Sequence, residues 1–336
     1  MAQTTIHDIA RQAGVCIGTV SRVLNNKDRV HPETRQRVQR IVDQTGYRPS
    51  AMGRGLVTRR SHNIMLLVHN LADPHCVSLA KHLSRLCRTQ GYRLLIGDSD
   101  YEPALEAECL RDVRDGSADG LIVSPLAGRR NVLLYRKLAD AGFPVVALMD
   151  AVPGVKVACV NYDDLGAGRM ATDYLLDKGH RHIAFAGWHT EFQTVQDRIR
   201  GYEESHAARQ LAVRPELRLQ FPRLLSKVRE KLAHVLGLSP VPTAILAENE
   251  MVALTCCNAL TQLGRRVPQD VAVMVFGDEL PAGTAPVPMT AVSWRPGELC
   301  ERALELLLTQ LNPSGAASQA SAMTTLAPQL ILRASA

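Results

Sequence analysis

One short stretch near the N-terminus combines an apolar side with a side that can form hydrogen bonds. Val20, Val23 and Leu24 recur at the spacing of a helix stripe. The opposite side carries hydroxyl, amide and guanidinium groups, which can contact the phosphates and base edges of DNA. The alternative is a small pair of helices buried in a larger core. The residues on the outer side are Ile17, Gly18, Thr19, Ser21, Arg22 and Asn25.

A helix before this stretch would hold it in place. Apolar residues recur at three- and four-residue spacing from Ile6 to Ala13, which predicts one buried helix face. Thr5 and Asp8 can cap the first turn, because the threonine oxygen accepts a hydrogen bond from a free backbone N–H. Gly14 follows, and a tight turn tolerates glycine because it has no Cβ. Two short helices joined by such a turn indicate a helix-turn-helix.

The positive charge of the chain is concentrated around the same elements. A third helix is predicted from Pro32, with Val38, Ile41 and Val42 on its inner face. Residues 1–60 hold eleven Lys or Arg and four Asp or Glu, a net charge of +7, whereas the whole chain carries +6. The basic excess therefore belongs entirely to the N-terminal segment, as expected for a surface that contacts DNA phosphates.

Several other classes of protein are disfavoured by what the sequence lacks. The eight cysteines form no C-x-x-C pair, and we interpret them as reduced structural residues of a cytosolic protein. No apolar run approaches the roughly 20 residues of a membrane span, and residues 1–4 lead directly into the first helix without a signal peptide. The phosphate-loop, zinc-protease and nucleophile-elbow motifs of enzymes are missing. His180 and His182 are conceivable metal ligands, but we expect no metal, no cofactor and no enzyme.

From residue 63 the pattern changes to alternating strands and helices. Unbroken apolar strands separated by helices imply parallel sheets that are covered on both faces. The segment 290–292 is expected to cross back to the first lobe, where the helix 296–310 packs. The predicted strands are 64–68, 91–97, 119–124, 145–148, 182–187, 243–247, 271–276 and 330–332, and the predicted helices are 77–89, 103–114, 130–141, 166–178, 197–209, 227–236, 250–263 and 296–310.

Several motifs, spaced in order, resemble the LacI/GalR (lactose-repressor) family of bacterial transcription regulators. They are D-I-A-x-x-A-G-V from Asp8, T-V-S-R-V-L-N from Thr19, V-x-P-E-T-R from Val30, G-Y-R-P from Gly46 and R-x-L from Arg54. The resemblance extends over nearly the whole chain. It implies a small all-α helix-turn-helix head and an α/β core of two parallel, doubly wound subdomains of periplasmic-binding-protein type.

The resemblance also implies the domain boundaries and the function. The head covers 1–47, a hinge helix or linker 48–61, and the effector-binding and dimerisation core 62–336. Within the core, the N-subdomain covers about 62–161 and 292–322, and the C-subdomain about 162–291 and 323–336. We expect a cytoplasmic, nucleoid-associated homodimer that represses a carbohydrate-utilisation operon by binding palindromic double-stranded operator DNA under the control of a small effector. The alternative is a soluble sugar-binding protein or a sugar-acting enzyme with the same core.

In this family, the beginning of the second helix reads the major groove, where the variable positions are Ile17, Gly18 and Arg22 in this sequence. Arg22 is suited to a guanine, which accepts two hydrogen bonds at O6 and N7; the alternative is a solvated arginine. Leu56 matches the hinge leucine that enters the minor groove. Cys16 replaces the usual Ser, a better helix cap. The DNA-binding residues implied by the resemblance are Thr5, Ile6, Ile17, Gly18, Thr19, Ser21, Arg22, Asn25, Arg29, Thr34, Ser50, Arg54 and Leu56.

The same resemblance implies an effector site. Arg198 lies in a D-R-x-x-G-Y stretch where the family has its ligand-binding arginine; the alternative is an arginine that only pairs with a buried carboxylate. Gly277 replaces an aspartate that binds sugar hydroxyls in the family, so we expect a pocket more favourable to an anion and favour a gluconate-like sugar acid over a neutral sugar. The effector-binding residues implied are Pro74, His75, Ser124, Asp150, Asp163, Trp188, Arg198, Asn249 and Asp278.

Overall fold

The computed structural model describes residues 4–24, 30–47, 60–128, 130–188, 191–221, 226–312 and 322–336. The chain divides into two compact units, Met1–Ser61 and His62–Ala336. Five of the predicted DNA-binding residues lie outside the described residues: Asn25, Arg29, Ser50, Arg54 and Leu56.

The first unit contains the three predicted helices, α1 (Ile6–Ala13), α2 (Ile17–Leu24) and α3 (Pro32–Thr45). Thr5 and Asp8 form the expected capping box, in which each side chain accepts a hydrogen bond from the other residue's backbone N–H. Gly14 ends α1 in the left-handed conformation with φ of 61°. The three helices share a small apolar core of Ile9, Ala10, Ala13, Val20, Val23, Val38 and Val42.

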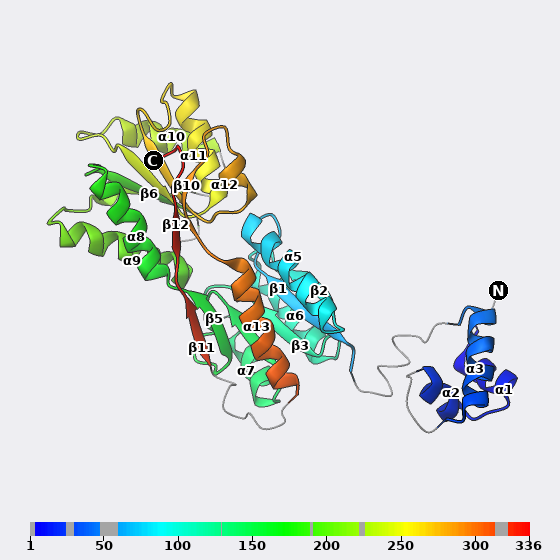
Figure 1. Cartoon of the computed structure of the whole chain (residues 1–336). Helices are drawn as coiled ribbons and strands as arrows, with labels where there is room; N and C mark the ends of the chain where they lie inside the picture. The colour runs from blue at the N-terminus through cyan, green and yellow to red at the C-terminus, as the bar shows by residue number, and fades with distance from the viewer. Residues whose placement is uncertain are drawn as a thin grey trace. The chain divides into compact units, whose positions relative to one another are not determined.

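Two six-stranded sheets form the second unit (Figure 1). The first has the strand order β11-β5-β4-β3-β1-β2, and all its neighbouring strands are parallel. The second has the order β12-β10-β9-β8-β6-β7 and is parallel except for β12, which runs antiparallel to β10. The strands are β1 (Asn63–Val68), β2 (Arg93–Asp98), β3 (Gly120–Val123), β4 (Val145–Leu148), β5 (Ala158–Tyr162), β6 (Ile183–Gly187), β7 (Arg218–Gln220), β8 (Ala244–Ala247), β9 (Ala272–Phe276), β10 (Thr290–Ser293), β11 (Met323–Leu326) and β12 (Gln329–Ile331).

Helices connect the parallel strands, so the predicted alternation is confirmed. In the first lobe α5 packs against α13, and in the second lobe α8 packs against α9. None of the described helices combines the length and the apolar character of a membrane span. The helices are α5 (Pro74–Thr89), α6 (Pro103–Arg114), α7 (Val132–Asp140), α8 (Asp164–Asp177), α9 (Gln193–Ala208), α10 (Ser226–Leu236), α11 (Glu250–Gln262), α12 (Leu280–Thr284) and α13 (Pro296–Leu311), with a short 3₁₀ turn at Pro215–Leu217.

The crossings between the lobes differ from the expectation. Thr290–Ser293 remains in the second sheet as β10, and the chain crosses back only before α13. Met323–Leu326, which we expected in the C-subdomain, pairs with β5 in the first sheet as β11, and the chain returns to the second sheet as β12 (Figure 1). Both β11 and β12 are edge strands with partly exposed residues, so they lack the continuous apolar run that marks the central strands.

The apolar core continues from one lobe to the other. Leu66 and Val160 of the first sheet belong to the same buried cluster as Phe185 and Phe276 of the second sheet. The two lobes are therefore joined by shared packing as well as by chain crossings.

Candidate functional site

The outer side of α2 is accessible to a partner. Ile17, Gly18 and Arg22 are exposed, while Thr19 and Ser21 are half-buried. The predicted base-reading positions thus lie on one accessible helix surface. Their contacts with DNA remain a prediction, as do those of Thr5, Ile6 and Thr34, of which Thr5 is exposed and the other two half-buried.

The start of α2 has an unusual side chain at its boundary. The Cys16 Sγ atom lies 3.3 Å from the Thr19 hydroxyl, and this hydrogen bond is the main reason why the pKa of the thiol is lowered. Cys16 is the exposed member of the eight free cysteines, five of which are buried. Sulfur is a weak hydrogen-bond acceptor, so it caps the helix less well than a serine oxygen.

A pocket in the second unit lies where several parallel strands end. Within two residues of a strand end, β1 is followed by His69, β3 by Ser124, β4 by Asp150, β8 by Glu248, β9 by Gly277 and β10 by Trp294, and all six line the pocket. Ligands of open α/β sheets bind at the carboxyl ends of the strands. The cavity leaves about 90 Å³ for the centres of water molecules, enough for several waters or a small polar ligand.

Five of the nine predicted effector residues line this pocket: His75, Ser124, Asp150, Arg198 and Asn249. The other four lie outside its lining. Asp163 caps α8 by accepting a hydrogen bond from the Gly166 N–H at 2.8 Å, and Asp278 pairs with Arg333 at 2.5 Å. The Trp188 backbone N–H donates to Glu248 Oε2 at 2.7 Å, and Pro74 occupies the first turn of α5. The effector-binding roles of all nine residues remain predictions.

Arg198 combines a structural ion pair with a place in the pocket wall. Its Nε donates to Asp164 Oδ1 at 2.7 Å, and its Nη1 donates to the backbone oxygen of Glu248 at 2.9 Å. The guanidinium also lies 5.0 Å from the Phe276 ring centre and 5.1 Å from that of Trp294. Burial raises the pKa of Asp164 to about 6 in spite of this pairing. Arg198 therefore pairs with a buried carboxylate, as the alternative interpretation stated, and it also lines the pocket.

A second buried pair joins the two lobes across the pocket. His75 Nδ1 lies 2.6 Å from Glu279 Oε1. Burial is the largest single influence and disfavours both charged forms, but the hydrogen bond and the attraction between the charges together outweigh it, so the pKa of His75 is raised and that of Glu279 is lowered. Glu250, which accepts from the Ala282 N–H at 2.9 Å, has its pKa raised to about 8 by burial and by the nearby Glu279 carboxylate.

The pocket is acidic, contrary to our expectation of a site suited to an anion. Five carboxylates line it, whereas Arg198 is the one Lys or Arg among the described lining residues. Gly277 does lack the expected acid, but its φ is +106° and an added Cβ would lie 3.3 Å from Glu279 Oε2 and 3.4 Å from Glu250 Cγ. Gly277 removes one acid from the pocket, but Glu250 and Glu279 lie beside it. The glycine therefore does not favour a gluconate-like ligand. The lining carboxylates are Asp73, Asp150, Glu248, Glu250 and Glu279.

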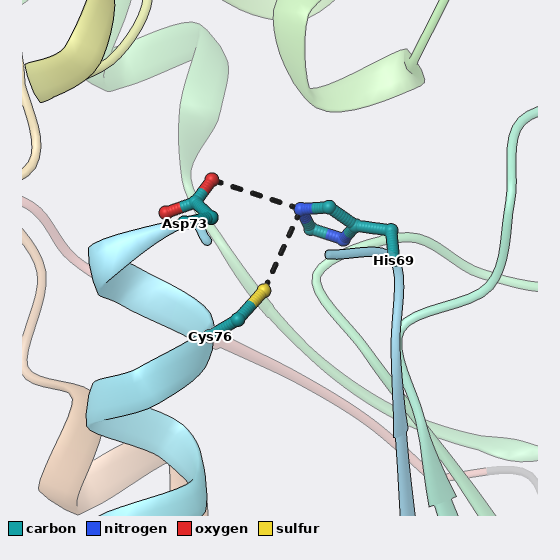
Figure 2. A group of neighbouring side chains, drawn as sticks. All are labelled: His69, Asp73 and Cys76. Atoms are coloured by element: carbon teal, nitrogen blue, oxygen red, sulfur yellow. Dashed lines mark hydrogen bonds and ion pairs between the residues drawn. The ribbon is translucent and has the colours of Figure 1, made fainter. Parts of the chain in front are cut away.

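His69 faces both Asp73, the N-cap residue of α5, and Cys76, which lies on α5 (Figure 2). Its Nε2 is 3.7 Å from Asp73 Oδ2 and 3.6 Å from Cys76 Sγ, and its Nδ1 is 3.1 Å from the Ser124 hydroxyl. These atoms are of types that bind zinc. Each also has a structural partner, since Asp73 caps α5 through the His75 N–H at 2.8 Å, and burial raises the pKa of the Cys76 thiol well above its usual value. His69 and Asp73 are part of the pocket wall, whereas Cys76 is fully buried and lies outside the lining.

The sequence interpretation did not identify most of the pocket lining. One available signal was position, because residues just after buried parallel strands face a common edge. Other lining residues, such as Tyr101 and Phe192, lie on loops that only the fold brings together. Their ring centres are 6.1 Å apart. The lining residues that we did not predict are His69, Asp73, Tyr101, Met149, Tyr162, Phe192, Thr194, Val195, Glu248, Glu250, Phe276, Gly277, Glu279 and Trp294.

Known proteins share both parts of this arrangement. Residues 5–50 match the family described as "Bacterial regulatory proteins, lacI family", and residues 172–336 match the "Periplasmic binding protein-like domain". The HTH-type transcriptional regulator CelR of Thermobifida fusca is 31% identical over 312 residues, which cover 90% of both chains. The HTH-type transcriptional regulator DegA of Bacillus subtilis is 28% identical over 292 residues, covering 87% of this chain and 86% of DegA.

Solved structures agree with these relatives. The CelR–cellobiose complex is 27% identical and covers 99% of this chain and 100% of its own, with a TM-score of 0.73. The lac repressor dimer bound to operator and the anti-inducer ONPF is 20% identical and shares the fold, with a TM-score of 0.86 and 99% of both chains covered. With a helix-turn-helix head, a two-lobed α/β core and these relatives, the chain belongs to the LacI family of bacterial regulatory proteins, which are DNA-binding transcription regulators and not enzymes.

Proposed function

We propose that the protein is a repressor that binds a palindromic operator as a homodimer and responds to a small effector in the interlobe pocket. The observation that carries the proposal is the combination, in one chain, of a basic head that exposes Arg22 on α2 and a two-lobed core with a polar pocket at its strand ends. The domain division into head (1–47), hinge (48–61) and core (62–336) belongs to the same proposal.

In this proposal the head of each subunit occupies one half-site. Arg22 donates two hydrogen bonds to a guanine, Ile17 and Gly18 face neighbouring bases, and the hydroxyls of Thr19 and Ser21 hold phosphates. The hinge residues Arg54 and Leu56, with Asn25, Arg29, Thr34 and Ser50, complete the DNA contacts. Gly18 has no side chain and so offers no side-chain hydrogen bond to a base.

The effector acts by changing the relation of the two lobes. His75 and Ser124 belong to the first lobe and Arg198 and Asn249 to the second, so a ligand that contacts all four favours one arrangement of the lobes over another. CelR has been solved with cellobiose, which supports a carbohydrate-type effector and control of carbohydrate-utilisation genes. A repressor of this kind works in the cytoplasm in association with the nucleoid.

The test is to select binding sites for the full-length protein from random double-stranded DNA and then to compare Arg22→Ala with Arg37→Ala. Arg37 is also exposed and lies on α3, so it provides the same loss of charge away from the reading surface. We expect Arg22→Ala to weaken binding to the selected site by roughly 1–3 kcal/mol, with little loss on random DNA. If both variants lose the same binding free energy on the selected site and on random DNA, Arg22 contacts the DNA backbone and not a base. Failure to select any sequence would refute the function.

A further inference from the structure

The charges of the pocket do not balance internally. Arg198 forms an ion pair with Asp164, and His75 forms one with Glu279. His69 lies 3.7 Å from Asp73. Among the described residues, no Lys, Arg or His forms an ion pair with Asp150 or Glu250. Asp150 and Glu250 are therefore carboxyl groups without a cationic partner, although the protonated form of Glu250 shares a hydrogen bond with Glu279.

Both groups are held in unfavourable surroundings. Burial, followed by the Asp164 carboxylate, raises the pKa of Asp150 to about 7, although Arg198 partly opposes the effect. Asp197 adds a further unfavourable charge, and the Thr194 N–H donates to Asp150 Oδ1 at 3.1 Å. Buried acids of this kind destabilise a fold, so they are typical of places where a ligand supplies the missing charge.

Two further polar atoms of the pocket lack hydrogen-bond partners among the described residues. Tyr162 is 4% exposed, and its hydroxyl has no partner among the described residues; the same holds for His75 Nε2. The two rings meet edge to face with centres 5.8 Å apart. A phenol and an imidazole can donate hydrogen bonds to hydroxyl or ring oxygens of a ligand.

Aromatic rings provide flat surfaces beside these polar groups. Trp294 already stacks on Tyr162, with centres 4.6 Å apart, and on Phe276, with centres 6.5 Å apart. The half-buried Tyr101 is therefore the more accessible ring of the lining. Such rings pack against the apolar face of a saturated ring and also attract a cation. The pocket thus offers stacking surfaces, neutral donors and unpaired carboxylates together.

We propose that the effector is a hydroxylated ring that carries a protonated amine, with Asp150 as the carboxylate that receives its positive charge and Glu250 as a second acid of the pocket lining. A neutral sugar leaves both acids without compensation, and a sugar acid adds a further anion to five carboxylates. The inference rests on the proposed function of the pocket and specifies its ligand class.

Binding of a cation favours the ionised form of these acids, so it releases protons. Asp150 and Glu250 have raised pKa values of about 7 and about 8, and a substantial fraction of each is protonated near neutral pH when no cation is bound. A neutral ligand leaves this equilibrium nearly unchanged, and an anion shifts it towards proton uptake. The direction of proton exchange therefore reports the charge of the ligand.

The experiment uses isothermal titration of the full-length protein with matched sugars that differ in charge. The probes are glucosamine, glucose and gluconate, with the corresponding galactose and mannose sets. We expect one amine to bind at least about tenfold more tightly than its neutral and acidic partners, since charge-assisted hydrogen bonds exceed neutral ones by this order. Titration in buffers of different ionisation enthalpy, at a pH low enough for the free amine to be fully protonated, should show proton release.

Variants identify the groups responsible. Asp150→Asn should remove most of the preference for the amine and Glu250→Gln should reduce it less, while the matched changes Asp112→Asn and Glu108→Gln on the exposed surface of α6 should leave it intact. The two pocket variants remove buried carboxyl groups, and a urea titration checks that they remain folded.

The inference is overturned if a neutral or acidic sugar binds as tightly as its amine, if the pocket variants keep the preference, or if none of the sugars binds. Operator binding is measured separately with the selected DNA. A protein that binds its operator and responds to a neutral sugar contradicts only the ligand class. A protein that binds no DNA contradicts the proposed function itself.

Discussion

Asp150 is held in the pocket at the expense of stability. Its pKa is raised from 3.8 to about 7, mainly by burial and by Asp164. The unfolded chain therefore loses this proton at lower pH than the folded chain does, so stability falls as the pH rises from about 4 to about 7 and the penalty is complete above that range. The shift corresponds to roughly 4 kcal/mol as an upper figure, because the half-buried side chain keeps some contact with water.

We predict that Asp150→Asn stabilises the protein at about pH 8 and leaves its stability nearly unchanged at about pH 4, because the amide cannot ionise. Urea unfolding at a series of pH values measures the difference, with Asp112→Asn on the surface of α6 as the control. An equal effect of Asp150→Asn at both pH values would show that the change acts through packing and not through charge.

The sequence alone could not reveal this property of Asp150. The groups that set its pKa are Asp164, Arg198 and Asp197, which lie far along the chain and reach Asp150 only through the fold. Gly277 was misread in a similar way: Glu250 comes from another segment, and although Glu279 is only two residues further on, the sequence does not show that its carboxylate turns back towards the glycine. The residue types of a site can be inferred from motifs, but its net charge depends on three-dimensional neighbours.

At the scale of elements, prediction succeeded where burial is complete. The strands β1, β4, β8 and β9 are continuous apolar runs because both faces of a parallel sheet are covered. The strands β7 and β11 were missed, since they lie at sheet edges and have alternating or exposed residues. β10 was also missed, because we expected its short run of mixed polar and apolar residues to be a crossing between the lobes. β5 was also missed, because its short run is interrupted by the half-buried Asn161.

The start of α2 provides a test at the scale of one element. Replacing Cys16 with Ser supplies an oxygen that can accept a hydrogen bond from the first turn, and we expect it to stabilise α2 by about 0.5–1 kcal/mol. Hydrogen exchange of the amides in α2 should slow accordingly in the full-length protein. Cys16→Ala, which removes the Thr19 contact without providing an acceptor, is the control and should not slow exchange. Equal exchange rates in the serine and alanine variants would show that the side chain at position 16 does not determine the stability of α2.

At the scale of the whole molecule, the two units divide the charge. The head segment 1–60 is strongly basic, whereas the pocket in the second unit is lined by acids. The two functions need opposite potentials, because phosphates attract cations and the proposed effector requires anions. The predicted hinge, residues 48–61, joins the two units along the chain, and we propose that effector control of DNA binding acts through this segment.

This segment contains Gly53 and Gly55 on either side of Arg54, and it lies outside the described residues. From the sequence we expect its helix to form on DNA, and each glycine costs a helix roughly 1 kcal/mol relative to alanine. The double change Gly53→Ala with Gly55→Ala should therefore tighten operator binding by about tenfold or somewhat more and weaken the response to effector, which has to overcome the added helix stability.

The measurement is operator affinity of the full-length double variant with and without effector. Gly46→Ala is an instructive comparison, because Gly46 ends α3 with φ of 62° and an alanine there is strained, so it should weaken and not strengthen the head. If the double variant binds the operator less tightly while its far-UV spectrum and stability are unchanged, the glycines serve close approach to the DNA backbone. In that case a methyl group clashes where the hinge meets the minor groove, and the entropic account of the hinge is wrong.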